Sequence, residues 1–180
     1  MKQYFFYTLT IISLLNITHT AWAESHIEAF IAAQYLALNN TQNRGTDTKD
    51  KHASLGAGFG IYRASTDSTS YGFVVEISQP VSRDDLPGSG KIIGVRPINY
   101  LKRYSARWSQ EIYGGFAQYE WIKSAGGYYL GSNIRYRLAN APLSVALDLK
   151  YYQDLNYDDS EFDDLIAQGF NSGITLIYTF

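Results

Sequence analysis

The chain contains no cysteine and few charged residues for its length. Without cysteine it cannot form a disulfide framework, a thiolate zinc site or a cysteine nucleophile. Charged residues make up 18% of the sequence, whereas soluble domains average about 25%. The 15 basic residues nearly balance the 17 acidic ones, which argues against a strongly basic nucleic-acid binder.

Long apolar runs are also missing after the N-terminal segment. The mean hydropathy of −0.21 argues against several membrane helices. It leaves a membrane β-barrel open, because barrel strands alternate apolar and polar residues and average to a neutral hydropathy. Aromatic residues are abundant at 16% of the chain, and the 180 residues fit a single domain.

The N-terminal segment has the pattern of a secretory signal peptide. Lys2 gives a positive start, residues 4–15 form an apolar run, and Ala21-Trp22-Ala23 offers a small-x-small cleavage site. A membrane anchor helix is the alternative, but the run is shorter than the ~20 residues that a span needs. We therefore expect a signal peptide at residues 1–23 and an exported mature chain at residues 24–180.

The mature chain alternates with period two, which is typical of β-strands. In residues 143–152, the odd positions are leucine, valine or tyrosine, and the even ones are small or charged except for Tyr152. One face of each such segment is large and apolar, and the other is glycine, small or charged. The pattern predicts eight strands, at about residues 25–38, 53–64, 71–79, 91–102, 109–122, 128–138, 143–153 and 166–180.

The connections between these segments alternate between mostly longer, polar ones and shorter ones. The first group is residues 39–52, 80–90, 123–127 and 154–165, and the second is residues 65–70, 103–108 and 139–142. Long and short connections at opposite ends are typical of outer-membrane barrels. We expect an all-β, eight-stranded antiparallel up-and-down transmembrane β-barrel, with a bulge or a late strand start at Pro97.

The charged residues fall on the strand faces that also carry glycine, which predicts a narrow charged lumen. Large side chains would fill the space left by Gly56, Gly58 and Gly60. We expect the strand at residues 109–122 to point Phe116, Gln118 and Glu120 inward. Unpaired buried charges are costly, so the lumen charges must pair. The candidate network is Glu76, Glu120, Arg135, Arg137, Asp148 and Lys150.

Aromatic residues gather near both ends of the expected strands, as in the two girdles of bilayer barrels. Ordinary sheet packing is the alternative for any one of them. Near the long connections lie Tyr35, Tyr119, Trp121, Tyr128 and Tyr151. Near the short ones lie Tyr71, Tyr100, Tyr104, Trp108, Tyr136, Tyr178 and Phe180.

On this pattern the mature chain resembles the small eight-stranded outer-membrane β-barrels of Gram-negative bacteria. The most specific element is the C-terminus, where Ile174, Leu176, Tyr178 and Phe180 occupy alternate positions up to the terminal aromatic. The resemblance implies that these four residues are the signal read by the barrel-assembly machinery. A final strand that simply ends apolar is the alternative.

The resemblance also extends to enzymes, because lipid A deacylases and palmitoyltransferases share this barrel size. His52-Ala-Ser54 matches the His-x-Ser letters of the deacylases, although it lies early in the chain, and Asp50 could complete a His, Asp and Ser set. The alternative for His52 is a solvated loop residue. A charged lumen also leaves no room for an acyl chain.

An acidic stretch at residues 153–165 offers a weak cation site. Asp154, Asn156 and Asp158 have the spacing that opens a calcium loop, but Asp159 stands where glycine is expected. A solvated acidic loop is the alternative.

These observations favour a non-enzymatic, porin-like outer-membrane protein without a cofactor, acting in envelope integrity or through surface loops. Its expected partners are outer-membrane lipid, lipopolysaccharide and the barrel-assembly machinery, with no nucleic acid. The alternatives are a lipid A-modifying acyl enzyme, a soluble lipocalin-like carrier with an apolar lumen, and a small channel.

Overall fold

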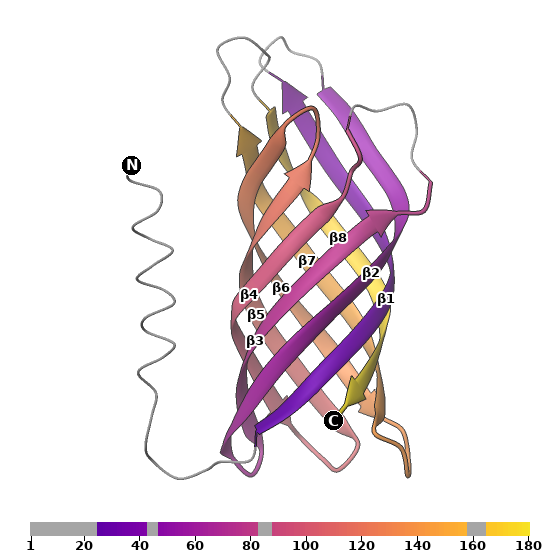
Figure 1. Ribbon diagram of the computed structural model, residues 1–180, viewed down its shortest axis with the longest axis vertical. Helices are drawn as coiled ribbons and strands as arrows, with labels where there is room; N and C mark the ends of the chain where they lie inside the picture. Colours follow the sequence, from indigo (N-terminus) through magenta and orange to yellow (C-terminus); the bar gives the residue numbers. More distant parts are fainter. Residues whose placement is uncertain (1–24, 43–46, 83–87, 158–164) are drawn as a thin grey trace.

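The computed structural model describes residues 25–42, 47–82, 88–157 and 165–180, which form eight strands. The predicted signal peptide, residues 1–23, lies outside the described residues. Figure 1 shows the strands inclined around a common axis. Their bounds are β1 (Ser25–Gln42), β2 (Asp47–Thr66), β3 (Thr69–Pro80), β4 (Ile92–Arg103), β5 (Trp108–Glu120), β6 (Ser124–Arg137), β7 (Leu143–Tyr157) and β8 (Leu165–Thr179).

Each strand pairs antiparallel with the next, and β1 also pairs with β8, so the sheet closes into a barrel. The predicted fold class and the existence of all eight strands are therefore confirmed. Strands β1 and β2 are longer than expected, because their ladder continues through polar residues up to the pair Thr41 and Asp47. No helix among the described residues is long and apolar enough to cross a membrane.

The two ends of the barrel differ, as Figure 1 shows. The start of β1, the C-terminus and the short β2–β3, β4–β5 and β6–β7 connections share one end, here called the turn end. The β1–β2, β3–β4, β5–β6 and β7–β8 connections lie at the opposite end, the loop end. Only β3–β4 and β7–β8 are longer than every connection at the turn end, so the expected alternation of long and short connections holds only in part. The β4–β5 turn is closed by the Ser105 hydroxyl, which accepts from the backbone N–H of Trp108 at 3.0 Å. In the β6–β7 turn Asn140 adopts a φ of 58°, in the left-handed region that asparagine tolerates.

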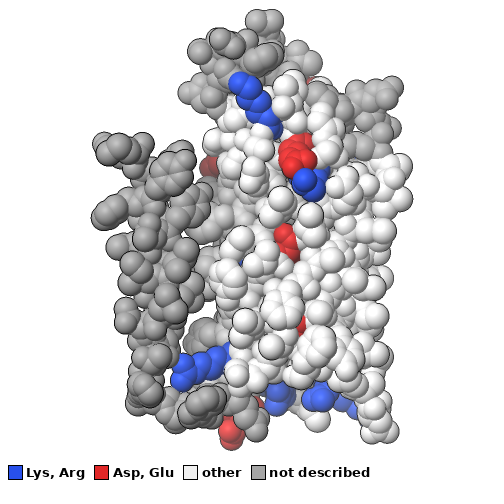
Figure 2. Space-filling model, in the orientation of Figure 1, with Lys and Arg blue, Asp and Glu red and all other residues white. Residues whose placement is uncertain are grey.

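Large apolar side chains cover the outside of the barrel. Ile98, Leu130 and Leu147 are 68%, 67% and 64% exposed. A water-soluble domain would bury such side chains, since each costs about 1.5–3 kcal/mol when left in water. Figure 2 shows that the middle of the visible face is mostly uncharged, with lysine and arginine lying toward both ends.

The predicted girdle at the turn end is present on the outer surface. Trp108 packs on Tyr136 with ring centroids 4.9 Å apart, and Tyr178 packs on Phe180 at 4.7 Å. At the loop end the prediction is wrong for two residues. Tyr119 and Trp121 are 0% and 3% exposed, because both rings point into the barrel.

A β-bulge interrupts β4 at Pro97, as the sequence predicts. The register of β4 against β5 shifts between Val95 and Ile98. Proline has no N–H to donate to the ladder, so the extra residue is tolerated there. The bulge changes the alternation, and both Arg96 and Asn99 consequently face inward and are buried.

Glycines make room for aromatic rings inside the barrel. A Cβ on Gly58 would lie 2.2 Å from the ring of Phe30, and one on Gly131 would lie 2.4 Å from the ring of Tyr113. Such distances leave no space for any side chain at these positions. The expected filling of glycine gaps by large side chains from other strands is therefore observed.

Candidate functional site

Seven buried side chains of alternating charge cross the lumen in an unbroken series. Each is at most 8% exposed, and they come from β1 and from β3 to β7. We call this series the charge chain; in spatial order it is Glu28, Arg135, Glu111, Arg96, Glu76, Lys150 and Asp148.

Arg135 joins the first two acids of the charge chain. Its Nη1 lies 3.0 and 2.8 Å from the two carboxylate oxygens of Glu28, and its Nη2 lies 2.5 Å from Glu111. Its Nε donates to Asn133 at 2.9 Å. The planar guanidinium suits this use, because it presents several donors in a fixed geometry.

Glu76 joins the other half of the charge chain. It accepts from Arg96, whose Nε lies 3.1 Å from one carboxylate oxygen, and from Lys150 Nζ at 2.7 Å. Lys150 also lies 3.7 Å from Asp148, and Arg96 lies 3.8 Å from Glu111. Each buried charge therefore has an opposite partner, which offsets the cost of removing it from water.

Tyrosine hydroxyls satisfy further carboxylate oxygens of the charge chain. Tyr62 donates to Glu111 at 2.6 Å, Tyr113 to Asp148 at 2.5 Å and Tyr129 to Glu76 at 2.7 Å. The guanidinium of Arg96 also lies 3.9 Å from the ring centroid of Tyr113. The carboxylates are thus held by fixed donors, which suits a structural lock better than proton transfer.

Two residues of the predicted network lie elsewhere. Glu120 faces outward at the loop end of β5, where it binds Lys91 at 2.6 Å and accepts from Ser89 at 2.6 Å. Arg137 is exposed at the turn end of β6. The other four predicted members, Glu76, Arg135, Asp148 and Lys150, belong to the charge chain.

The error in β5 is one of alternation. Its inward residues are the odd-numbered Glu111, Tyr113, Ala117 and Tyr119, whereas Phe116 is 65% exposed. Tyrosine resembles an outward aromatic when only the sequence is read, so the sequence assigns the inner and outer faces of this strand the wrong way round. The predicted network lacks three members of the charge chain, Glu28, Glu111 and Arg96. The acid on the tyrosine face of β5 signals Glu111, and the bulge at Pro97 signals Arg96.

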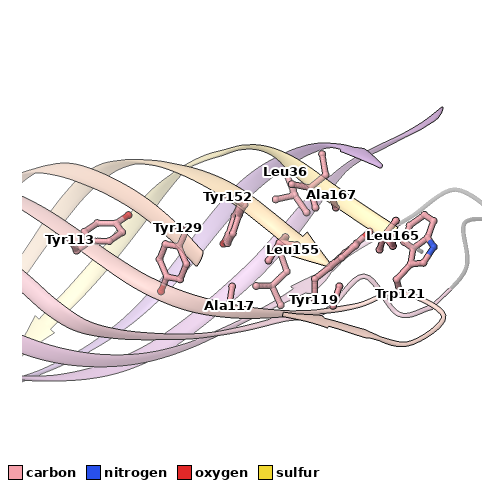
Figure 3. Close-up of a cluster of buried hydrophobic side chains, with 13 residues drawn as sticks. Leu36, Tyr113, Ala117, Tyr119, Trp121, Tyr129, Tyr152, Leu155, Leu165 and Ala167 are labelled. Atoms are coloured by element: carbon pink, nitrogen blue, oxygen red, sulfur yellow. The ribbon is translucent and has the colours of Figure 1, made fainter. Parts of the chain in front are cut away.

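Beyond the charge chain, toward the loop end, the lumen is filled by an apolar cluster. Figure 3 shows rings and aliphatic side chains following one another along the barrel as far as Trp121. The cluster consists of Leu36, Leu38, Ile92, Tyr113, Ala117, Tyr119, Trp121, Ala125, Tyr129, Tyr152, Leu155, Leu165 and Ala167.

The candidate catalytic residues lie inside the lumen rather than in a solvated loop. His52 is 4% exposed, and its Nδ1 lies 2.8 Å from Asp50. Asp50 also accepts from Tyr119 at 2.5 Å, and Ser54 accepts from Ser78 at 3.0 Å. The alternative of a solvated His52 is therefore wrong, and the Asp50–His52 pair is buried beside the apolar cluster.

The candidate cation ligands are only partly described. Asp154 and Asn156 lie within β7 rather than in a loop, and Asp158 lies outside the described residues. Asp154 sits at a register shift of β7 against β8 and accepts from Tyr128 at 3.0 Å. Within the described part of the chain, no three His, Asp or Glu side chains group closely enough to hold a metal ion.

The four residues of the proposed assembly signal lie on the outer face of β8. Ile174, Leu176, Tyr178 and Phe180 are 57%, 40%, 43% and 71% exposed. They form one apolar row on the outer surface, which runs to the turn end beside β1.

Solved structures of small outer-membrane barrels resemble this one despite low sequence identity. Neisserial surface protein A, NspA, gives a TM-score of 0.54 at 5% identity, covering 87% of this chain and 97% of that one. The N-terminal β-barrel domain of Pseudomonas aeruginosa OprF gives 0.49 at 10% identity, covering 86% and 97%. Ail, the attachment invasion locus protein of Yersinia pestis, gives 0.45 at 9% identity, covering 87% and 99%.

No family model matches the sequence, and a comparison with curated proteins also finds no match. The agreement with NspA extends over nearly the whole of both chains and concerns the fold alone. This protein has the closed, eight-stranded, antiparallel up-and-down barrel fold of the small outer-membrane proteins.

Proposed function

We propose that this protein resides in the outer membrane and acts there without catalysis, in envelope integrity or through its loop-end connections. The observation that carries the proposal is an apolar exterior around a charged, filled lumen. This is the reverse of a lipocalin-like carrier, which needs an apolar lumen and a polar exterior. The turn-end girdle supports the placement, because amphipathic rings favour the headgroup level.

Export by a cleaved signal peptide is part of the same proposal. Cell fractionation with mass spectrometry tests it, and we expect a mature chain starting at residue 24 in the outer-membrane fraction. The folded barrel should also change its gel mobility on heating. Recovery of the mature chain in the soluble periplasm would contradict the proposal.

The outward position of the C-terminal residues supports recognition by the barrel-assembly machinery. We expect Phe180→Ala to lower the amount of heat-modifiable protein in the outer membrane while leaving refolding in detergent unchanged. Tyr104→Ala removes another exposed aromatic at the turn end and serves as the control. Equal losses for both variants would remove the proposed role of Phe180.

Contacts with lipopolysaccharide are a further part of the proposal. Lys49 and Lys51 are exposed on the outer face of β2 at the loop end, where lipid A phosphates would lie in an outer membrane. If these contacts exist, the Lys49→Gln/Lys51→Gln variant should release more lipopolysaccharide than the parent during purification in mild detergent.

A strain lacking the protein separates the two suggested roles. If the barrel itself supports the envelope, both the parent and a variant with residues 158–164 replaced by Gly and Ser should restore resistance to detergent. If the loop acts through a partner, only the parent should restore the phenotype. An unchanged phenotype on deletion, together with a periplasmic location, would contradict both roles.

A further inference from the structure

A cavity of about 810 Å³ opens at the turn end of the barrel. All eight strands contribute to its wall, and Glu28 and Arg135 lie at its inner end. The charge chain closes it there, so it is open only toward the turn end. Its volume lies within the ~300–1,000 Å³ that is typical of small-molecule sites.

Three arginines surround the mouth of this cavity: Arg103, Arg107 and Arg137. Arg107 donates to the Tyr136 hydroxyl at 3.2 Å. The side chains of Arg103 and Arg137 show no hydrogen bond or ion pair to the residues that the structure describes. The N–H donors of these two arginines are therefore available to a ligand, as far as the described part of the chain is concerned.

The acids of the cavity do not cancel these cations. Glu28 is bound to Arg135 through both carboxylate oxygens. Asp67 is exposed on the β2–β3 turn. The lining thus holds four arginine side chains against two acidic ones, so basic side chains are in excess.

Hydroxyl groups supply neutral donors in the same cavity. Ser70, Ser109 and Ser144 line it, and their hydroxyls make no side-chain hydrogen bond within the described residues. Guanidinium groups bind phosphate through two parallel N–H donors, and serine hydroxyls add single hydrogen bonds to its remaining oxygens. The combination fits a tetrahedral oxyanion better than a cation or an apolar ligand.

The level of the cavity also points to phosphate. Trp108 lies at the rim of the cavity, and its half-exposed ring packs on Tyr136 in the outer girdle. Such rings mark the headgroup level of a bilayer. The inference that the cavity lies at the level of the lipid phosphates rests on the proposed membrane location, whereas the existence of the cavity and its arginines does not.

We propose that the turn-end cavity binds a phosphate-bearing anion through Arg103 and Arg137, with the serine hydroxyls as supporting donors. The phosphate could come from a lipid headgroup or from a soluble anion, and the volume leaves space for a glycerol or sugar attached to it. The site lies at the opposite end from the long connections, so it goes beyond the proposed function.

Trp108 is a natural reporter for this site, because Trp22 belongs to the predicted signal peptide and Trp121 can be replaced. The mature Trp121→Phe chain is folded in a maltoside detergent, which contains no phosphate, and titrated with inorganic phosphate at constant ionic strength. We expect a saturable change in Trp108 emission. If this variant does not show heat-modifiable mobility, the unmodified chain is titrated by calorimetry instead.

The double variant Arg103→Gln/Arg137→Gln should weaken phosphate binding about tenfold or more, because both guanidinium groups that would pair with the anion lose their charge. Arg63→Gln is the matched control, because it removes one basic residue at the same end but outside the cavity. The affinity of the Arg63→Gln variant for phosphate should stay within about twofold of the parent value, whereas a tenfold loss would correspond to about 1.4 kcal/mol.

Short-chain phosphatidylglycerol in mixed micelles identifies the source of the phosphate. Competition with inorganic phosphate supports a lipid headgroup in the cavity, and the absence of competition supports a soluble anion. No saturable signal from either probe, or equal weakening by Arg63→Gln and by the double variant, would overturn the proposal.

Discussion

At the scale of single residues, burial decides how much a charge matters in this barrel. Arg135 and Arg137 lie two positions apart on β6, but the first is 5% exposed and binds two carboxylates. The second is exposed at the turn end. The same substitution should therefore have very different effects at these two positions.

Replacing Arg135 by methionine should destabilise the barrel strongly. The change leaves Glu28 without its arginine and leaves Glu111 with only the more distant Arg96, at 3.8 Å. Breaking a buried ion pair in this way costs about 3–5 kcal/mol. The free energy of unfolding in urea, measured in lipid vesicles, tests this. Arg137→Met is the control and should stay within about 0.5 kcal/mol of the parent.

A triple variant separates charge from packing in that experiment. Combining Arg135→Met with Glu28→Gln and Glu111→Gln removes the uncompensated charges and should recover most of the lost stability. A triple variant as unstable as Arg135→Met alone would show that packing, rather than the charge chain, accounts for the loss.

Gly131 is a second residue whose environment fixes its identity. A Cβ at this position would lie 2.4 Å from the ring of Tyr113, which cannot move freely because Asp148 accepts its hydroxyl. Gly131→Ala should cost about 1–3 kcal/mol, as overpacked sites usually do. Gly126→Ala on the same strand is the control, since no atom would lie within 4 Å of a Cβ added at Gly126. Equal stability of the two variants would contradict the packing described for Tyr113.

At the scale of strands, alternation fixes which side chains meet lipid and which fill the lumen. The sequence predicts the faces of residues 143–150 in β7 correctly, because the outer positions there are leucine or valine and the inner ones small or charged. In β8 the outer apolar row from Ile174 to Tyr178 is likewise predicted correctly. It fails for β5, where Tyr113 and Tyr119 fill the lumen and Phe116 lies outside. Both faces of that strand carry aromatic residues, so hydrophobicity alone does not distinguish them.

The orientation of β5 can be tested with a charge on its outer face. Phe116→Arg should lower the free energy of unfolding in lipid by about 2–4 kcal/mol, as arginine does near the bilayer midplane. Gln118→Arg lies on the same face nearer the loop end, where the cost falls to about 0–1 kcal/mol. Similar losses for both variants would place Phe116 outside the apolar belt.

At the scale of the whole molecule, the lumen is occupied from the charge chain to the loop end. The side chains of the charge chain and of the apolar cluster are almost entirely buried. An eight-stranded barrel has an interior just wide enough for such side chains, so they occupy this part of the lumen. The arrangement favours a rigid barrel whose activity lies at its two ends and its outer surface.

The filled lumen predicts that the folded barrel does not conduct ions. Planar bilayers containing the purified mature chain should show no stable current steps above the leak of protein-free membranes. Steady, reproducible conductance steps would contradict the occupied lumen and revive the small-channel alternative. Arg135→Met with Lys150→Met is the informative companion, since loosening the charge chain is the change most able to open a path.

The sequence by itself determined the strand number, the closed antiparallel topology and the apolar exterior, because period-two alternation is a local property of neighbouring residues. It also placed Glu76, Arg135, Asp148 and Lys150 on inward faces. Only the tertiary structure decided which charges meet. Arg96 enters the lumen because of the bulge at Pro97, and Glu28 reaches Arg135 across the barrel although 107 residues separate them. Such contacts depend on barrel closure and register, which no local pattern contains.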